Sequence, residues 1–244
     1  MKKRAFADLH QHLLWGLDDG PDTPKRMHAL LRQNARQGVA VICATVHADP
    51  RRSPVDWALY QKRLAAANAY CAKHHLPIQI LSGSEIMYRD AAPDLLADGK
   101  LLPLGNSRYV LIEFPERIDL ASIEGAADSL YRAGYRPILA HVERYRRLIR
   151  SPKRAMALRE EYGILYQMNC NIVLRPRGLR TRYFVWRMLR ERAIDLIASD
   201  AHDADARPVQ MRAAYKCIAE RYGTAYARRL MCGGGSLLGI GREQ

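Results

Sequence analysis

The chain has 244 residues, 48% hydrophobic and 26% charged, which is the balance of a globular protein and excludes a disordered or fibrous one. Its net charge of +14 favours anionic partners such as phosphoproteins, nucleic acid or a lipid surface, unless the excess simply solvates the outer helices. The longest apolar stretch, Val39 to Val46, is far shorter than the roughly 20 residues of a membrane-spanning helix.

The N-terminal residues and the cysteines indicate a cellular compartment. The basic segment Met1 to Arg4 leads directly to Ala5 without the apolar segment of about 7 to 15 residues that export requires. The 5 cysteines are widely spaced and form no Cys-x-x-Cys, which argues against a disulfide framework or a zinc ribbon. We therefore expect a cytoplasmic protein with reduced thiols.

Short apolar runs alternate with longer segments of helical periodicity, the pattern of repeated β-α units on a parallel sheet. The predicted strands cover residues 4 to 9, 39 to 46, 78 to 83, 109 to 114, 137 to 142, 165 to 169 and 195 to 199. Helices are predicted from Asp22-Thr23-Pro24 to Gly38 and at about 54 to 74, 119 to 133, 151 to 161, 180 to 192 and 207 to 231. No linker rich in proline or glycine divides the chain. We expect one α/β domain over residues 1 to 244, a distorted seven-stranded TIM-like barrel.

Ionisable side chains recur where the apolar runs end. They are His10, His12, His47, Glu85, Glu113, His141, Asp200 and His202, with Asp19 in the loop after the first run. Barrel enzymes build their sites at the carboxyl ends of strands, so these side chains are expected to meet at one rim. Such a group needs compensating ions, and imidazoles with carboxylates suit Mn, Fe or Zn. The set exceeds the capacity of one ion, which predicts two or three divalent metal ions.

Some of these signals are weak in isolation. The pair His10 and His12 lies on one side of an extended strand, but a single His-x-His is also common as two polar residues at a strand end. Asp18 and Asp19 precede Gly20 and could serve only as loop and helix-capping residues. We expect one of these carboxylates to face metal and the other to hold the backbone or another ligand.

Two arginines are candidates for phosphate binding. Arg144 follows His141 within three positions, and a guanidinium can grip phosphate oxygens through two hydrogen bonds. Arg207 lies shortly after Asp200 and His202, although it could also simply begin the following helix.

Several phosphate-handling motifs are absent. The residues six positions after the cysteines are Asp49, Pro77, Pro176, Gly223 and Leu238. None is arginine, so the Cys-x5-Arg signature of a thiol-dependent tyrosine phosphatase is missing. The sequence also contains no Gly-x4-Gly-Lys-Ser/Thr loop and no Gly-x-Ser-x-Gly elbow.

The ordered segments resemble the PHP (polymerase and histidinol phosphatase) superfamily of metal-dependent phosphoesterases. More narrowly, the chain is similar to the bacterial capsule and exopolysaccharide tyrosine-protein phosphatases. The resemblance covers nearly the whole chain. The segments that carry it are Asp8 to His12, Leu17 to Pro21, Gly83 to Ile86, Ser107 to Phe114, Ile138 to Tyr145, Gln167 to Asn169, Ile197 to His202 and Arg207-Pro208.

The resemblance implies the PHP fold and a site for three metal ions, with Mn first and Fe or Zn as alternatives. The implied ligand sets are His10, His12, Glu85 and Asp200 for one ion, Glu85, Glu113 and His141 for a second, and Asp19, His47 and His202 for the third. By the same resemblance, Arg144 and Arg207 bind phosphate and stabilise its charge.

Three segments depart from the family pattern. Leu14-Trp15-Gly16 replaces Leu-Pro-Gly, Ala48-Asp49-Pro50 follows His47, and the tail from Cys232 to Gln244 lacks Asn-Pro. The metal set is retained, whereas substrate choice is not fixed by these motifs.

The expected activity is hydrolysis of phosphotyrosine on a protein by a hydroxide carried on metal. The resemblance implies a membrane-associated bacterial tyrosine kinase as the substrate, so the enzyme would act near the inner membrane surface. We expect no stable nucleic-acid complex and no transmembrane segment, and a homo-oligomer is compatible with the sequence. The alternatives are a phosphoesterase for small phosphate esters or nucleic-acid ends, and a regulator that binds metal without turnover.

Overall fold

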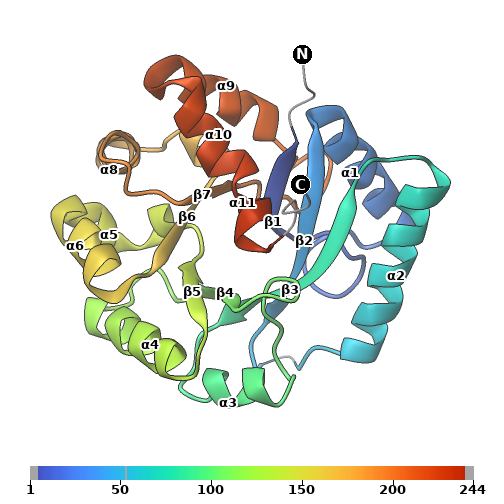
Figure 1. Cartoon of the computed structure of the whole chain (residues 1–244), viewed down its shortest axis with the longest axis horizontal. Coiled ribbons are helices and arrows are strands. Elements are labelled where there is room, and N and C mark those ends of the chain that lie inside the picture. The colour runs from blue at the N-terminus through green and yellow to red at the C-terminus, as the bar shows by residue number, and fades with distance from the viewer. Residues whose placement is uncertain (1–4, 53, 240–244) are drawn as a thin grey trace.

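Seven parallel strands run around the molecule in sequence order, each paired with the next, and helices cover the outside (Figure 1). The computed structural model describes residues 5–52 and 54–239. Its strands are β1 (Phe6–Gln11), β2 (Val39–Ala48), β3 (Gln79–Met87), β4 (Tyr109–Glu113), β5 (Arg136–Leu139), β6 (Leu165–Asn169) and β7 (Leu196–Ala198). The predicted seven-stranded TIM-like barrel is therefore confirmed. The predicted start of the first strand at residue 4 and the tail residues 240 to 244 lie outside the described residues.

The sheet closes on itself where the chain leaves β7. Gln11 and Ala201 form a parallel bridge, and the His12 amide donates to the Ala201 carbonyl at 3.0 Å. The Asp200 amide donates to the His10 carbonyl at 2.9 Å. These contacts bring the first and last strands together at the carboxyl end of the barrel, where the candidate site lies.

The longer helices follow the strands largely where predicted, and the described residues also form short helices at 92–97, 146–150, 170–174 and 234–237 that were not predicted. They are α1 (Pro24–Gln37), α2 (Trp57–Lys73), α3 (Ala92–Ala97), α4 (Leu120–Arg132), α5 (Arg146–Arg150), α6 (Pro152–Tyr162), α7 (Cys170–Leu174), α8 (Leu179–Arg190), α9 (Met211–Tyr222), α10 (Thr224–Cys232) and α11 (Gly234–Leu237), with the 3₁₀ helix η1 (Val142–Arg144). Thr23 caps α1, and Gly38 ends it with a left-handed φ of 89°, as the local sequence indicates.

The prediction of one helix over residues 207 to 231 is wrong. The chain is not helical before Met211, and Gly223 adopts a φ of 90° that divides α9 from α10. A positive φ is open to glycine because it lacks a Cβ atom. The predicted strand 137 to 142 is also too long, since β5 ends at Leu139 and His141 has a left-handed φ of 33°.

Apolar side chains fill the barrel below the site. The interior cluster joins residues from most of the strands and comprises Ala7, Leu9, Cys43, Leu104, Leu111, Ile138, Ala140 and Leu196. The short helix α11 contributes Leu237 to it and lies over the barrel centre in Figure 1. A larger cluster lies between the strands and the surrounding helices. Among the described residues, no helix is long and apolar enough to span a bilayer.

Candidate metal centre

The imidazoles and carboxylates at the strand ends lie together at one rim of the barrel. They come from β1 and the loop after it (His10, His12, Asp19), from β2 to β4 (His47, Glu85, Glu113), and from the turns after β5 and β7 (His141, Asp200, His202). Most of them are buried, but the side chains of His47 and Asp19 are 39% and 59% exposed. The site is thus enclosed on the barrel side and open where these two residues lie.

Alternation along the strands explains only part of this arrangement. In β4, Leu111 packs in the barrel interior and Glu113, two residues later, shares its face at the rim. In β1, interior Leu9 is followed directly by His10, which also turns into the site. The pairing of β1 with β2 shifts register in this half of the strand, which allows the change of face.

Two site residues adopt backbone angles that are uncommon outside glycine. His141 has a φ of 33° and Asp200 a φ of 51°. The His141 amide donates to the Gln167 side-chain oxygen at 2.8 Å, and the Asp200 amide bonds to His10 at 2.9 Å. Local hydrogen bonds from neighbouring strands therefore hold both left-handed turns, and strained backbone of this kind clusters at functional sites.

The innermost group surrounds the β1 histidines. His10 Nε2 lies 3.3 Å from His12 Nε2 and 3.2 Å from Glu85 Oε1. His12 Nε2 is 3.2 Å from Glu85 Oε2. Asp200 Oδ1 approaches the same two imidazole nitrogens at 3.5 and 3.6 Å. Four donors from distant parts of the chain thus face one point.

A second group continues from Glu85 across β4 and β5. His141 Nε2 lies 2.7 Å from Glu85 Oε1 and 3.5 Å from Glu113 Oε2. His47 Nδ1 faces the same carboxylates, at 3.1 Å from Glu85 Oε2 and 3.3 Å from Glu113 Oε1. Glu85 is therefore the shared residue of the first two groups.

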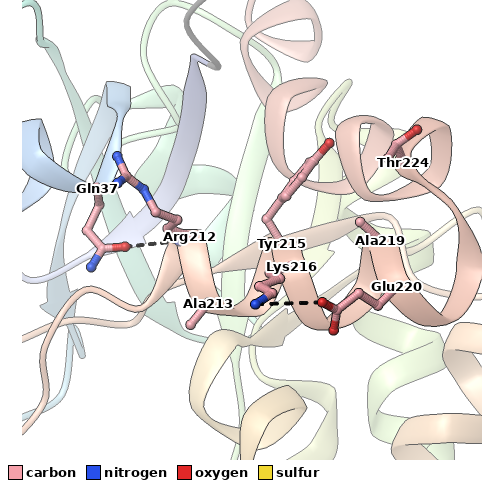
Figure 2. A pocket seen from close by; sticks show the side chains of 8 residues that line it. All are labelled: Gln37, Arg212, Ala213, Tyr215, Lys216, Ala219, Glu220 and Thr224. Carbon is pink, nitrogen blue, oxygen red and sulfur yellow. Dashed lines mark hydrogen bonds and ion pairs between the residues drawn. The ribbon is translucent and has the colours of Figure 1, made fainter.

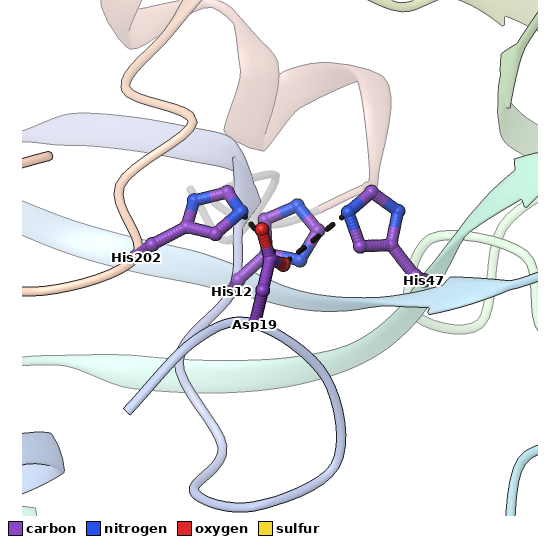
Figure 3. A group of neighbouring side chains, drawn as sticks. All are labelled: His12, Asp19, His47 and His202. Atoms are coloured by element: carbon purple, nitrogen blue, oxygen red, sulfur yellow. Dashed lines mark ion pairs between the residues drawn. The ribbon is translucent and has the colours of Figure 1, made fainter. Parts of the chain in front are cut away.

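The third group forms the exposed side of the site (Figure 3). Figure 3 shows Asp19 rising from its loop between the rings of His202 and His47, with His12 behind it. Asp19 Oδ1 lies 3.1 Å from His202 Nε2 and 3.4 Å from His47 Nε2. The His12 and His202 rings stack with centroids 3.9 Å apart.

These groups overlap more than the three sets implied by the family resemblance. Donor atoms of His12, Asp19, His47 and His202 lie mutually within 4.8 Å, so His12 belongs to this group as well as to the innermost one. His47 likewise joins Glu85 and Glu113 through its other nitrogen. That these residues bind metal ions stays a prediction, and the geometry shows which donors could share an ion.

Two observations indicate that these donor atoms suit divalent ions. Two ligands about 2.0 to 2.2 Å from one ion stand roughly 3 Å apart, which is the spacing between the imidazole and carboxylate atoms here. His202 Nε2 is buried and makes no hydrogen bond among the described residues, although Asp19 lies near it. A cation between these two atoms would satisfy both.

Carboxylates control the protonation of the histidines. Burial alone would lower the pKa of His12, but Asp18 and Glu85 outweigh it and raise that pKa to about 9. Glu113 and Glu85 likewise overcome burial and raise the pKa of His141 to about 9. The pKa of His47 rises to about 11, again against burial, through Asp19 and Glu113. Metal ions bind neutral imidazole, so ion binding at neutral pH would release protons from this site.

Asp18 contacts two of the candidate ligands, His12 and His47. Its Oδ2 lies 2.7 Å from His12 Nδ1 and accepts a hydrogen bond from the His47 amide at 3.1 Å. Its Oδ1 accepts from the Gly20 amide at 3.0 Å. The expectation that one of the two adjacent acids holds the backbone and another ligand agrees with this geometry, and Asp18 is that acid.

Sequence reasoning gave no role to two amides at the end of β6. Gln167 Oε1 lies 3.1 Å from His10 Nδ1, and its amide nitrogen donates to Asn169 Oδ1 at 2.7 Å. Asn169 Nδ2 in turn donates to Asp200 Oδ2 at 2.8 Å. Their i, i+2 spacing at a predicted strand end was the available signal, because it places both side chains on the face that the ligands share.

Both candidate arginines meet at Asp200. Arg144 Nη2 lies 2.5 Å from Asp200 Oδ2, and Arg207 Nη2 lies 3.2 Å from the same oxygen. Arg207 Nη1 also reaches Asp19 Oδ2 at 3.3 Å. Arg144, Asp200 and Arg207 line a cleft of about 690 Å³. The two guanidinium groups therefore connect the ligand cluster with an open cavity.

A separate groove lies far from this chemistry (Figure 2). It has a volume of about 610 Å³ and is lined by residues of α9, by Thr224 and by Gln37, two residues before β2 begins. Figure 2 shows Lys216 paired with Glu220 there, and Arg212 beside Gln37. This groove lies toward the amino ends of the strands, and none of the predicted site residues lines it.

The fold and the site together define a β/α-barrel protein whose carboxyl-end rim carries imidazole and carboxylate donors suited to several metal ions. The family model for capsular polysaccharide synthesis, CpsB/CapC, matches residues 6–238. The chain belongs to the CpsB/CapC family.

Individual relatives match along nearly their whole length. The tyrosine-protein phosphatase CpsB of Streptococcus pneumoniae is 32% identical over 240 residues, which cover 92% of this chain and 94% of that protein. The tyrosine-protein phosphatase YwqE of Bacillus subtilis is 28% identical over 219 residues, covering 90% and 86%.

Solved structures agree on the fold. A chain from crystal structures of YwqE and CpsB, described as unique metal-dependent tyrosine phosphatases, matches with a TM-score of 0.82 at 28% identity, covering 91% of this chain and 89% of that one. The phosphotriesterase homology protein of Escherichia coli matches with a TM-score of 0.58 at 10% identity and shares the barrel fold alone.

Proposed function

We propose that this chain is a metal-dependent phosphatase that hydrolyses phosphotyrosine on proteins. One observation carries the proposal: Arg144 and Arg207 both form ion pairs with Asp200. Asp200 lies between the imidazole and carboxylate donors of the rim and an open cleft. A phosphoryl group at this point would lie beside both guanidinium groups. The relatives named tyrosine-protein phosphatases support the choice of substrate.

The ions would be held by the strand-end donors. We propose that two or three divalent ions, Mn foremost with Fe or Zn as alternatives, are bound by His10, His12, Asp19, His47, Glu85, Glu113, His141, Asp200 and His202. Such ions would supply a nucleophilic oxygen at neutral pH and neutralise negative charge on the phosphate.

The arginines would orient the substrate and stabilise the charge that develops on it. Both are paired with carboxylates in this structure, so an incoming phosphate would replace the Asp200 contacts of Arg144 and the Asp19 contact of Arg207. A guanidinium presents two parallel N–H donors to phosphate oxygens, which fixes the direction of the ester bond as well as its charge.

A covalent thiol intermediate has no support in this site. All 5 cysteines are free, and none lines the cleft beside Asp200. Burial raises the pKa of the Cys43 and Cys170 thiols, which disfavours the reactive thiolate. A phenolate is a tolerable leaving group, so phosphotyrosine needs little help from a general acid.

The substrate would be a membrane-associated tyrosine kinase that controls capsule or exopolysaccharide synthesis. The family description as capsular polysaccharide synthesis supports this assignment. We propose a cytoplasmic location for the enzyme, near the inner membrane surface, and one working domain over residues 1 to 244. The net charge of +14 would favour approach to a phosphorylated tail beside anionic lipid.

A substrate panel tests the activity. Purified protein is loaded with Mn and assayed with a phosphotyrosine peptide, histidinol phosphate and phosphorylated single-stranded DNA, then again with excess chelator. We expect turnover of the peptide that chelator abolishes and Mn restores. Preferential turnover of histidinol phosphate or DNA would reassign the enzyme to small esters or nucleic-acid ends, and inactivity on every substrate with bound metal would indicate a regulator.

A further inference from the structure

The cleft beside Asp200 extends well past the arginines that face the metal-type donors. Its volume of about 690 Å³ lies within the roughly 300 to 1,000 Å³ of pockets that hold whole ligands, so it accommodates more than one phosphoryl group. Its far part is lined by the connection between α7 and α8, which contributes Arg175 and Arg177. The cleft wall therefore carries Arg175 and Arg177 in addition to Arg144 and Arg207, and Glu116 and Glu143 line the same cleft.

The two pairs of arginines differ in their partners. Arg144 and Arg207 both pair with Asp200, and Arg207 also pairs with Asp19. Within residues 5–52 and 54–239, neither Arg175 nor Arg177 has an acidic group within ion-pair distance, and both side chains are exposed. A free pair of guanidinium groups in a cleft wall is suited to a carboxylate or phosphate of a ligand.

The backbone restricts where these two side chains can lie. Pro176 stands between them and fixes its own φ, and it also restricts the residue before it. The Arg175 amide donates to the Asn171 carbonyl at 2.8 Å, which ties the segment to the end of α7. These restraints reduce the conformational entropy that this segment loses when Arg175 and Arg177 bind a ligand.

We propose that Arg175 and Arg177 bind an anionic side chain that neighbours the phosphotyrosine in the substrate. This specificity site rests on the proposed function, because Arg144 and Arg207 must hold the target phosphate for a neighbouring residue to reach the far wall. The ligand chemistry is one carboxylate or one phosphate on the same peptide. A substrate segment with clustered acidic or phosphorylated residues meets this requirement, whereas a small phosphate ester does not.

The experiment compares two double variants of the Mn-loaded enzyme. Arg175→Gln with Arg177→Gln removes the proposed site. Arg180→Gln with Arg228→Gln removes the same charge from exposed arginines that do not line the cleft. Both are assayed on one phosphotyrosine peptide in which the neighbouring residue is Ala, Asp or a second phosphotyrosine, and on p-nitrophenyl phosphate.

We expect the wild-type enzyme to have a KM for the Asp and double-phosphotyrosine peptides about fivefold below its KM for the Ala peptide. A difference of this size is what partly exposed ion pairs contribute. The cleft variant should lose this preference with an unchanged kcat, and it should process p-nitrophenyl phosphate as the wild type does. The Asp and phosphotyrosine arms show whether the site prefers carboxylate or phosphate.

Two results would overturn the inference while leaving the proposed function intact. One is equal KM for all three peptides in the wild type. The other is an equal loss of preference in the Arg180 and Arg228 control, which would assign the effect to net charge and not to the cleft wall. Failure of the wild type to hydrolyse any phosphotyrosine peptide, with turnover of p-nitrophenyl phosphate, would instead overturn the proposed function.

Discussion

Asp18→Asn removes one charge and one acceptor from a buried carboxylate that holds a candidate ligand in place. The side chain of Asp18 faces donors on both of its oxygens: His12 Nδ1 and the His47 amide on one, and the Gly20 amide on the other. Asparagine keeps the shape but has a single acceptor oxygen. Either orientation of its amide therefore sets an N–H₂ group against a backbone N–H.

The magnitude follows from these contacts. If the Asn oxygen replaces Oδ1, its nitrogen faces His12 Nδ1 and forces a proton onto Nε2, the atom 3.2 Å from Glu85. A protonated Nε2 cannot coordinate metal. If the Asn oxygen replaces Oδ2, His12 keeps its tautomer. It loses the negatively charged Asp18 carboxylate, which makes the imidazole a better metal ligand. Loss of such an orienting partner costs about 10- to 100-fold in metal affinity, or about 1.4 to 2.7 kcal/mol.

The assay is calorimetric titration of Mn into metal-free protein, with circular dichroism to verify folding. Asp22→Asn is the matched control, because Asp22 lies near the same loop with a 64% exposed side chain that forms a surface ion pair with Arg26. We expect Asp22→Asn to bind Mn as the wild type does. Unchanged Mn affinity in a folded Asp18→Asn variant would refute the assigned role of Asp18.

Three further predictions follow from the site and its supports. Arg144→Ala should lower kcat/KM for a phosphotyrosine peptide by about 100-fold, as for removal of a group that stabilises transition-state charge; an unchanged value would remove Arg144 from phosphate binding. Alkylation of all accessible thiols should leave activity intact in the folded, Mn-loaded enzyme, and inactivation without unfolding would contradict a thiol-free mechanism. Asp195→Asn should lower the free energy of unfolding by about 1 to 3 kcal/mol in urea denaturation, because Asp195 accepts from Arg159 and from the Tyr166 amide at 2.9 Å; Glu191→Gln, at an exposed ion pair, should cost under about 1 kcal/mol.

Local sequence was sufficient for the seven strands, for most of the longer helices and for the residue types of the candidate site. Short continuous apolar runs and the capping residues of α1 report backbone conformation, and that information lies within a few residues of each position. Parallel β-α repeats then require all strand ends to share one rim, which placed the strand-end histidines and acids together. The break at Gly223 was missed because a glycine inside a helical pattern is often tolerated.

The sharing of donors was decided only by the tertiary structure. Leu9 packs in the barrel interior while His10 beside it faces the site donors, because the register of β1 shifts against β2, and no property of the strand's own sequence indicates that shift. Gln167 meets His10 across 157 positions of sequence. His12 likewise belongs to two donor groups because residues that are distant in sequence approach it. The sequence by itself thus determined which chemical groups stand at the rim. Closure of the barrel decided which of them face each other, because that depends on contacts between strands that are distant in the chain.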